Sequence, residues 1–329
     1  MLDCVQVTSS LSLMSVDCGA TCCEAEVYAV RGVASRAIGV TLPAMIDLHV
    51  HSTASDGTRS PEELIVEAET LGLSALALVD HDTLSGLDAF QSAGAAATVA
   101  PIPGVELSCS WYGGNLHIVG LFVDPEDGPL QSLLTRVRAD RDGRNSKIVE
   151  ALNEQGIEID LADVLTRAKG ETVGRPHIAA ALVERGVCGD VRQAFHQLLG
   201  RGKPAFVSRY LPLPQESIRT IHGAGGVAVW AHPLAFSRRS RGQVRAMANQ
   251  LKQVGLDGLE TLYPDHKPDQ RRAAQALADD LDLLASGGTD YHGDHSPGVH
   301  MGVGYGDLQV PDTFLGPLRD RAESYRNAS

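Results

Sequence analysis

Histidines and carboxylates gather in three short stretches of the chain, each of which follows an apolar run. The stretches are Asp47–His51 (DLHVH), Val79–Asp82 (VDHD) and Gly288–His292 (GTDYH). Residues two apart in an extended strand point to the same side, so His49 and His51 can bind one ion together. Nitrogen and oxygen donors of this kind suit divalent metal ions, and the pattern supplies enough of them for more than one ion. The candidate ligands are His49, His51, Asp56, His81, Glu106, His117, His232, Asp290 and His292.

Each of these positions, taken alone, also has an ordinary structural interpretation. Asp56 lies in a Ser-Asp-Gly turn, and His81 lies between two aspartates that could cap a helix. His117 lies on an apolar strand, and His232 precedes a proline, so either could be structural. Glu106 differs, because a carboxylate can bridge two cations. Apolar strands do not normally place ionisable groups at so many successive ends, so the joint pattern favours a multinuclear metal centre.

The elements that would position these side chains alternate between apolar runs and helical segments from residue 45 onward. This alternation is typical of parallel βα units. One helix start is marked clearly, with Ser60 as N-cap, Pro61 as first helical residue and Glu63 completing a capping box; we expect that helix to run to Gly72. Polar residues at successive strand ends predict a barrel whose active site lies at the C-terminal ends of its strands. We predict strands over residues 45–50, 75–79, 99–105, 116–123, 226–230, 256–262 and 283–286.

The segment 124–213 breaks this alternation, because it is charged and helix-like and has no comparable β runs. We interpret it as a helical insertion, or cap domain. The barrel would then comprise residues 45–123 and 214–310, and residues 311–329 would form a C-terminal tail.

Residues 1–44 do not fit the barrel pattern. Four of the six cysteines lie within the first 23 residues, and the cluster Cys18, Cys22 and Cys23 could be a soft metal site, although no histidine lies nearby. The segment lacks the basic and apolar regions of a secretory signal. We expect either a poorly ordered extension or translation that begins upstream of the real start, with Met45 as the alternative initiator.

The composition limits the classes of function. The chain has 329 residues, 43% of them hydrophobic and 21% charged, which is enough for one large α/β domain or two average ones. No apolar run reaches 18 residues, so we expect no membrane span and a cytoplasmic location. The net charge of −13 argues against a surface for duplex nucleic acid. A nucleotide site remains compatible, because bound cations invert the local field. The sequence gives no oligomeric state.

The whole array resembles the PHP (polymerase and histidinol phosphatase) superfamily. Its motifs are matched by DLHVHS at 47–52, VDHDT at 79–83, PGVE at 103–106 with His117, and AHP at 231–233 with GTDYH at 288–292. The segments HSTASDG at 51–57 and LHIVG at 116–120 resemble the bacterial branch that includes the 5′→3′ exoribonuclease RNase AM and 3′,5′-nucleoside bisphosphate phosphatases.

This resemblance implies a distorted (β/α)7 barrel with two or three divalent metal ions, Mn²⁺ ahead of Fe²⁺ or Zn²⁺. A hydroxide bridging these ions would attack phosphorus in line. Asp80 and His81 could assist proton transfer, although metal binding would keep His81 from acting as a free base. The implied ligand sets are His49, His51, Glu106 and Asp290 for the first ion, Glu106, His117 and His232 for the second, and Asp56, His81 and His292 for the third.

Substrate contacts are expected in the insertion. Arg175 and His177 lie in a segment similar to one of that branch, and the Arg175 guanidinium suits bidentate phosphate binding. The alternative is a solvated helix start with Pro176 at its first position. Arg201 and Lys203 form a second basic loop.

The functional hypothesis is a metal-dependent phosphoesterase. It would act on 3′,5′-bisphosphorylated nucleosides, on short single-stranded 5′-phosphorylated RNA trimmed from the 5′ end, or on both. A histidinol-phosphate phosphatase and a non-catalytic PHP-like module are the alternatives.

Overall fold

The computed structural model describes residues 44–112, 114–165, 174–235 and 239–328. The expectations for the N-terminal extension and its cysteines lie outside these residues. No helix in the described ranges has both the length and the apolar composition that a membrane span needs.

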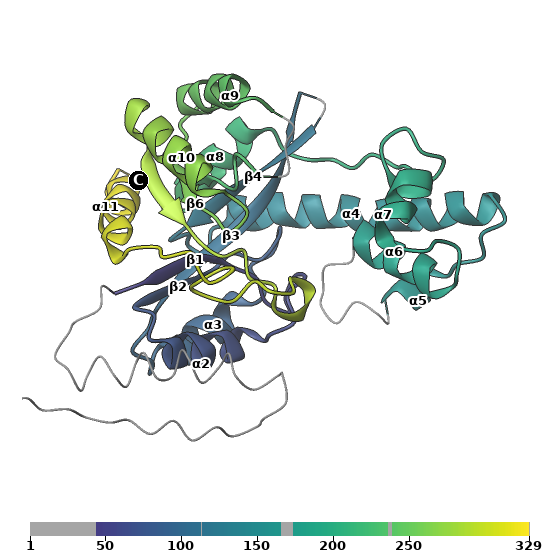
Figure 1. Cartoon of the computed structure of the whole chain (residues 1–329), viewed down its shortest axis with the longest axis horizontal. Helices are drawn as coiled ribbons and strands as arrows, with labels where there is room; N and C mark the ends of the chain where they lie inside the picture. Colours follow the sequence, from purple (N-terminus) through teal and green to yellow (C-terminus); the bar gives the residue numbers. More distant parts are fainter. Residues whose placement is uncertain (1–43, 113, 166–173, 236–238, 329) are drawn as a thin grey trace, which may run out of the picture. The chain divides into compact units, whose positions relative to one another are not determined.

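Seven strands form one curled sheet, in which strands that follow one another along the chain are also neighbours (Figure 1). The sheet curls into a half-barrel, and an isolated bridge between Val50 and Tyr291 connects its first strand to the segment that follows its last strand. The fold is therefore α/β, as predicted. The strands are β1 (Ile46–Val50), β2 (Ala75–Leu78), β3 (Ala100–Trp111), β4 (Gly114–Leu121), β5 (Val227–Trp230), β6 (Gly258–Leu262) and β7 (Leu284–Gly287).

Helices follow most of the strands. The predicted capping box of α2 is confirmed, with mutual hydrogen bonds between Ser60 and Glu63, Pro61 in the first turn, and Gly72 in the left-handed conformation at the C-cap. The α-helices are α2 (Pro61–Leu71), α3 (Leu87–Gly94), α4 (Gly128–Glu154), α5 (Leu161–Leu165), α6 (Arg175–Glu184), α7 (Val191–Ala194), α8 (Pro214–Gly223), α9 (Arg241–Gln253), α10 (Pro268–Asp280) and α11 (Leu315–Arg326). Short helical turns lie at η1 (Phe195–Leu199), η2 (Gly293–His295) and η3 (Asp312–Phe314).

The prediction of parallel βα units is wrong at β4, which runs antiparallel to both of its neighbours. The turn between β3 and β4 is far too short for the crossover that a parallel pair requires, so the two strands form a hairpin. In this hairpin Ser108 pairs with His117. Because β4 enters the sheet where its parallel neighbours end, His117 near its start reaches the same edge as the other candidate ligands.

Alternation along β2 shows how the sheet builds two cores. Ala75 and Ala77 point into the curl of the sheet, where they join a core that includes Val310 and Leu318. Leu76 and Leu78 point outward and pack against α2 and α3. The segment expected as a C-terminal tail thus carries α11, which contributes Leu318 and Ala322 to the inner core.

Helix α4 connects two hydrophobic clusters. At 27 residues it is about 40 Å long. Its first half, including Leu130 and Val137, packs with the outer face of the sheet. Its second half, including Ile148 and Leu152, packs with α6 and neighbouring helices of the insertion (Figure 1). In the described part of 124–213 the structure has helices and no strands. That these helices form a separate cap domain stays a prediction.

Close packing at Gly288 generates a stability prediction. A Cβ on this residue would lie 2.5 Å from the backbone nitrogen of His49 and 2.9 Å from Oδ1 of Asp47. We expect Gly288→Ala to lower the free energy of unfolding by roughly 1–3 kcal/mol, because backbone must shift to admit the methyl group. Gly143→Ala is the control, because its Cβ would meet nothing within 4 Å in the exposed middle of α4. It should raise stability by roughly 0.5–1 kcal/mol. Denaturant unfolding curves measure both changes, and equal stability of the two variants would contradict the prediction.

Candidate metal and anion site

The carboxylate of Glu106 lies at the centre of the candidate site, fully buried in β3. Its two oxygens contact five imidazoles, which four different segments contribute. Its Oε2 lies 3.3 Å from Nε2 of His49, 3.3 Å from Nε2 of His51 and 3.1 Å from Nδ1 of His81. Its Oε1 lies 3.0 Å from Nδ1 of His117 and 3.1 Å from Nε2 of His232.

One group of four ligand atoms has the spacing of a metal coordination shell. Asp290 Oδ1 lies 3.3 Å from His49 Nε2 and 3.1 Å from His51 Nε2, beside Glu106 Oε2. Ligands about 2.1 Å from an ion are separated by about 3.0–3.4 Å in octahedral or tetrahedral geometry. Within the described residues, His51 Nε2 and Asp290 Oδ1 are buried without a hydrogen-bond partner. A cation would satisfy both atoms, so this group fits a metal ion.

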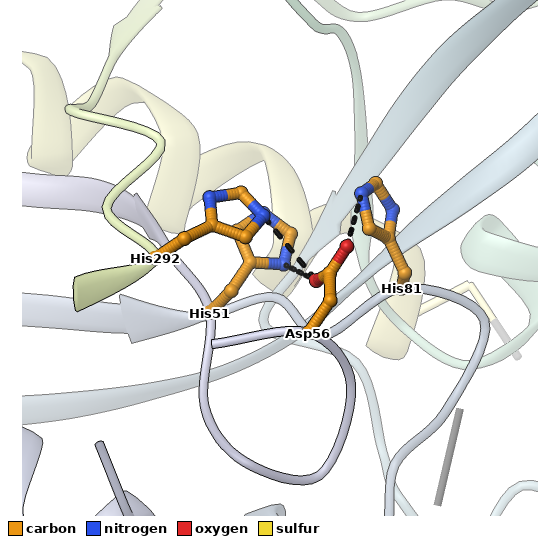
Figure 2. A group of neighbouring side chains, drawn as sticks. All are labelled: His51, Asp56, His81 and His292. Atoms are coloured by element: carbon orange, nitrogen blue, oxygen red, sulfur yellow. Dashed lines mark ion pairs between the residues drawn. The ribbon is translucent and has the colours of Figure 1, made fainter. Parts of the chain in front are cut away.

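A second group places Asp56 opposite three imidazoles. Figure 2 shows its carboxylate between His81 on one side and His51 and His292 on the other. Asp56 Oδ1 lies 3.2 Å from His292 Nε2, and Asp56 Oδ2 lies 3.9 Å from His81 Nε2. These distances leave room for an ion among the four side chains.

A third group consists of His81, Glu106 and His117. His81 therefore has a ring nitrogen near each of two groups. His232 lies beside this third group, through its contact with Glu106. The structure thus brings all the candidate ligands named from the sequence to one edge of the sheet.

Hydrogen bonds from outside these groups orient the ligand atoms. His49 Nδ1 lies 2.9 Å from Oε1 of Glu260, and the backbone N–H of His232 donates to Oε2 of the same carboxylate. Tyr263 donates to Asp290 Oδ2, which turns Oδ1 toward the imidazoles. Such partners fix the tautomer and direction of a metal ligand. Sequence reasoning missed Glu260, although a glutamate within an apolar strand is itself a signal.

The buried charges in the cluster shift the pKa values of its ligands. Burial pushes the pKa of Glu106 upward, but the surrounding imidazoles outweigh it and hold the pKa well below its ordinary value. Burial lowers the pKa of His49, His51 and His117, but neighbouring carboxylates outweigh it and raise each pKa above its ordinary value, so metal binding there would displace protons. Burial lowers the pKa of His81 to about 4, so its imidazole is neutral. A carboxylate anion and a neutral imidazole are the forms that bind divalent ions.

Asp80, expected to assist proton transfer, makes hydrogen bonds to the loop that follows β1. Its carboxylate accepts from the backbone N–H and hydroxyl of Ser52 and from the hydroxyl of Ser55. These bonds fix the loop between His51 and Asp56, so Asp80 positions two of the candidate ligands. A part in proton transfer stays a prediction.

Four arginines line a cavity of about 940 Å³ that also contains His81, His117 and Asp290. They are Arg141 and Arg144 of α4, Arg175 of α6, and Arg209. Arg141 and Arg144 are 5% and 7% exposed. Burial, together with the neighbouring arginines, lowers the pKa of Arg144 to about 9. Asp82 neutralises part of this charge, because it pairs with Arg141 and lies 3.6 Å from Arg209.

This arginine group has the properties of an anion site. Arg141 Nη1, Arg144 Nε and Arg209 Nη1 are buried without a hydrogen-bond partner among the described residues. A bound anion would supply partners and reduce the repulsion between the guanidinium groups. Of the substrate contacts expected from the sequence, Arg175 and His177 line this cavity, whereas Arg201 and Lys203 do not. Sequence reasoning did not assign Arg141, Arg144 or Arg209 to the site.

The buried charge of Arg144 can be tested by stability. We expect Arg144→Met to raise the melting temperature in buffer without multivalent anions, because it removes a buried charge that its neighbours repel. The same change should reduce the stabilisation that sulfate or phosphate gives to the wild type. Lys147→Met, on an exposed position of the same helix, should change neither quantity. Thermal unfolding with and without sulfate measures both effects, and an undiminished sulfate effect in Arg144→Met would contradict the anion site.

Comparisons with known proteins show to which family the chain belongs. The model of the PHP domain matches residues 47–183. A 5′-3′ exoribonuclease of Haemophilus influenzae is 40% identical over 75% of this chain and 89% of its own length. A 3′,5′-nucleoside bisphosphate phosphatase of Chromobacterium violaceum is 34% identical over 79% of this chain and 91% of its own.

A solved structure of a metal-dependent phosphoesterase from Bifidobacterium adolescentis superposes with a TM-score of 0.73 at 32% identity. The superposition covers 85% of this chain and 98% of that one. The resemblance to PHP proteins is thus confirmed by sequence and by fold. This chain belongs to the PHP family.

Proposed function

We propose that the chain is a metal-dependent phosphoesterase that acts on 3′,5′-bisphosphorylated nucleosides and trims short 5′-phosphorylated RNA from its 5′ end. One observation carries this proposal: the metal-binding groups and the buried arginine group line the same cavity. A ligand with two phosphates can therefore place one at each. The names of the two relatives, an exoribonuclease and a bisphosphate phosphatase, support this choice of substrates.

The ligand sets that the resemblance implies are part of the proposal. Their contacts to Glu106 and Asp56 support two or three divalent ions, with Glu106 shared between the first and second. Mixed imidazole and carboxylate donors suit Mn²⁺, Fe²⁺ or Zn²⁺ better than Mg²⁺, and we propose Mn²⁺. Bound ions would lower the pKa of a water molecule and neutralise the phosphate oxygens.

The arginine group would hold the 5′-phosphate. The 3′-phosphate would then lie at the metal edge, the edge of the sheet that carries the candidate ligands around Glu106. Arg175 and His177 lie in the first turn of α6, at the wall of the cavity that the insertion contributes. The insertion would therefore act as the substrate cap. Its arginines would bind and orient the nucleotide, while Glu260 and Tyr263 would keep His49 and Asp290 oriented as ligands of the first ion.

One bond change accounts for both activities. Water adds to the phosphorus of the 3′-phosphate, the bond between phosphorus and the 3′ oxygen breaks, and that oxygen takes a proton. A bisphosphate then gives a nucleoside 5′-monophosphate and inorganic phosphate. An RNA gives the same mononucleotide and a chain one residue shorter, which carries a new 5′-phosphate.

The two alternatives fit the cavity less well. Histidinol phosphate has a single phosphate and a cationic amine, which the arginine group would repel. A non-catalytic module would be expected to lack ligands, whereas every candidate ligand is present at the site.

The proposal is tested by stripping the protein of metal, reloading it with Mn²⁺ and assaying three substrates. We expect metal-dependent release of phosphate from adenosine 3′,5′-bisphosphate, or of mononucleotide from a short 5′-phosphorylated RNA. Hydrolysis of histidinol phosphate alone would contradict the proposal and favour a histidinol-phosphate phosphatase. No hydrolysis of any of the three substrates, with metal bound, would support the non-catalytic alternative.

Glu106→Gln should abolish hydrolysis while the fold is kept, because a neutral amide cannot bridge two cations. The loss should exceed about 10³-fold in kcat, since both ions lose a shared ligand. Glu150→Gln, exposed on α4, is the matched control and should be fully active. Initial rates, together with circular dichroism of each variant, provide the measurement. Full activity of Glu106→Gln would remove the bridging role.

The 5′-phosphate anchor predicts a substrate preference that depends on Arg175. The wild type should hydrolyse adenosine 3′,5′-bisphosphate with a higher kcat/KM than adenosine 3′-phosphate. Arg175→Gln should reduce that preference by about ten-fold or more, which corresponds to a charge-assisted hydrogen bond of roughly 1.5–3 kcal/mol. Arg192→Gln, exposed on α7, should keep the preference. An equal loss on both substrates would show that Arg175 does not contact the 5′-phosphate.

A further inference from the structure

A second cavity, of about 670 Å³, lies beside the metal edge. Its walls come from the start of β4, from the segment that follows β5, and from Arg239 and Gln243. Asn115 and His117 line both this cavity and the larger one. The two cavities therefore adjoin at candidate metal ligands, where the proposed function places the reacting phosphate.

The hairpin of β3 and β4 extends past the sheet edge and presents two aromatic residues. Tyr112 is 87% exposed at the tip, and its ring meets that of Trp111 edge to face at 4.9 Å. Trp111 packs against the outer core of the sheet, which anchors the pair. Tyr112 also has a φ of 29°, a strained value for a residue with a side chain. A large exposed ring on a supported, strained turn is a suitable surface for stacking a nucleobase.

Arg239 connects this tip to the second cavity. A Cβ built on Gly114 of the hairpin would lie 3.5 Å from Nη2 of Arg239, which also lines the cavity. Among the described residues that line the cavity, none is a carboxylate. In a chain with a net charge of −13, a cavity with an arginine and without a carboxylate favours an anionic ligand.

We propose that the second cavity and the hairpin tip bind the RNA strand that continues beyond the reacting phosphate. Arg239 holds the next phosphate of the strand, and Tyr112 stacks on a base. This proposal rests on the proposed function, because hydrolysis of an RNA differs from hydrolysis of a bisphosphate only by the nucleoside that stays attached to the reacting phosphate. The second cavity accommodates that nucleoside, so the protein can bind polynucleotides as well as mononucleotides.

The test compares two substrates in Tyr112→Ala and Arg239→Ala. For each protein, kcat/KM is measured on 5′-phosphorylated pentaadenylate and on adenosine 3′,5′-bisphosphate. We expect the ratio of RNA to bisphosphate to fall about ten-fold in each variant, mainly through KM, because stacking and phosphate contacts act on binding. Val66→Ala and Arg272→Ala, exposed on α2 and α10, should keep the wild-type ratio. An unchanged ratio in both test variants overturns the proposal, and so does a wild type that hydrolyses the bisphosphate but no RNA.

A binding measurement separates failure of this proposal from failure of the proposed function. RNA with 2-aminopurine at its first, second or third nucleotide is titrated into metal-free protein, so that no hydrolysis occurs. We expect fluorescence quenching at the second or third nucleotide in the wild type and its loss in Tyr112→Ala, with the first nucleotide unaffected by that change. Equal fluorescence in wild type and Tyr112→Ala at every position overturns the strand site, whether or not the protein hydrolyses any substrate.

Discussion

The rest of the site depends on the burial of one carboxylate among five imidazoles. Glu106 has no solvent exposure, and both of its oxygens contact histidines within 3.3 Å. Removing such charges from water costs several kcal/mol per ion unless other charges compensate for them. Partial compensation comes from the imidazoles, and divalent ions would complete it. Without metal, the cluster therefore contributes little to the stability of the protein, and its buried charge favours the binding of divalent ions.

The opposite charge is concentrated on the insertion side of the same cavity. Arg141 and Arg144 are buried with guanidinium nitrogens that have no partner in the described structure, and Asp82 holds Arg141 in place. The arginine group thus lacks an anion, and the Glu106 cluster would also favour an anion once divalent ions were bound to it. A nucleotide with phosphates at both ends of its ribose would supply an anion at both places, which is the arrangement that the proposed function requires.

Local sequence signals predicted local structure well. Ser60 and Glu63 predicted the start of α2. The pair His49 and His51 predicted the edge of the sheet at which the candidate ligands gather. Features that depend on contacts between distant segments of the chain were harder to predict. The antiparallel course of β4 follows from a short turn, and His117 reaches the edge only because of it. The sequence does not show which side of α4 is covered, so it did not predict that Arg141 and Arg144 are buried. The backbone is strained at Asp82 and Asp290, with φ of 54° and 52°, and no sequence pattern predicts these conformations.

The most direct test of the account is anomalous diffraction from a crystal grown with Mn²⁺ and a non-hydrolysable analogue of adenosine 3′,5′-bisphosphate. The account predicts at least two manganese peaks with Glu106 between them. It also predicts the 3′-phosphate analogue at those ions and the 5′-phosphate within hydrogen-bond distance of Arg144 and Arg175. Manganese elsewhere, or a 5′-phosphate bound away from the arginines, would contradict it.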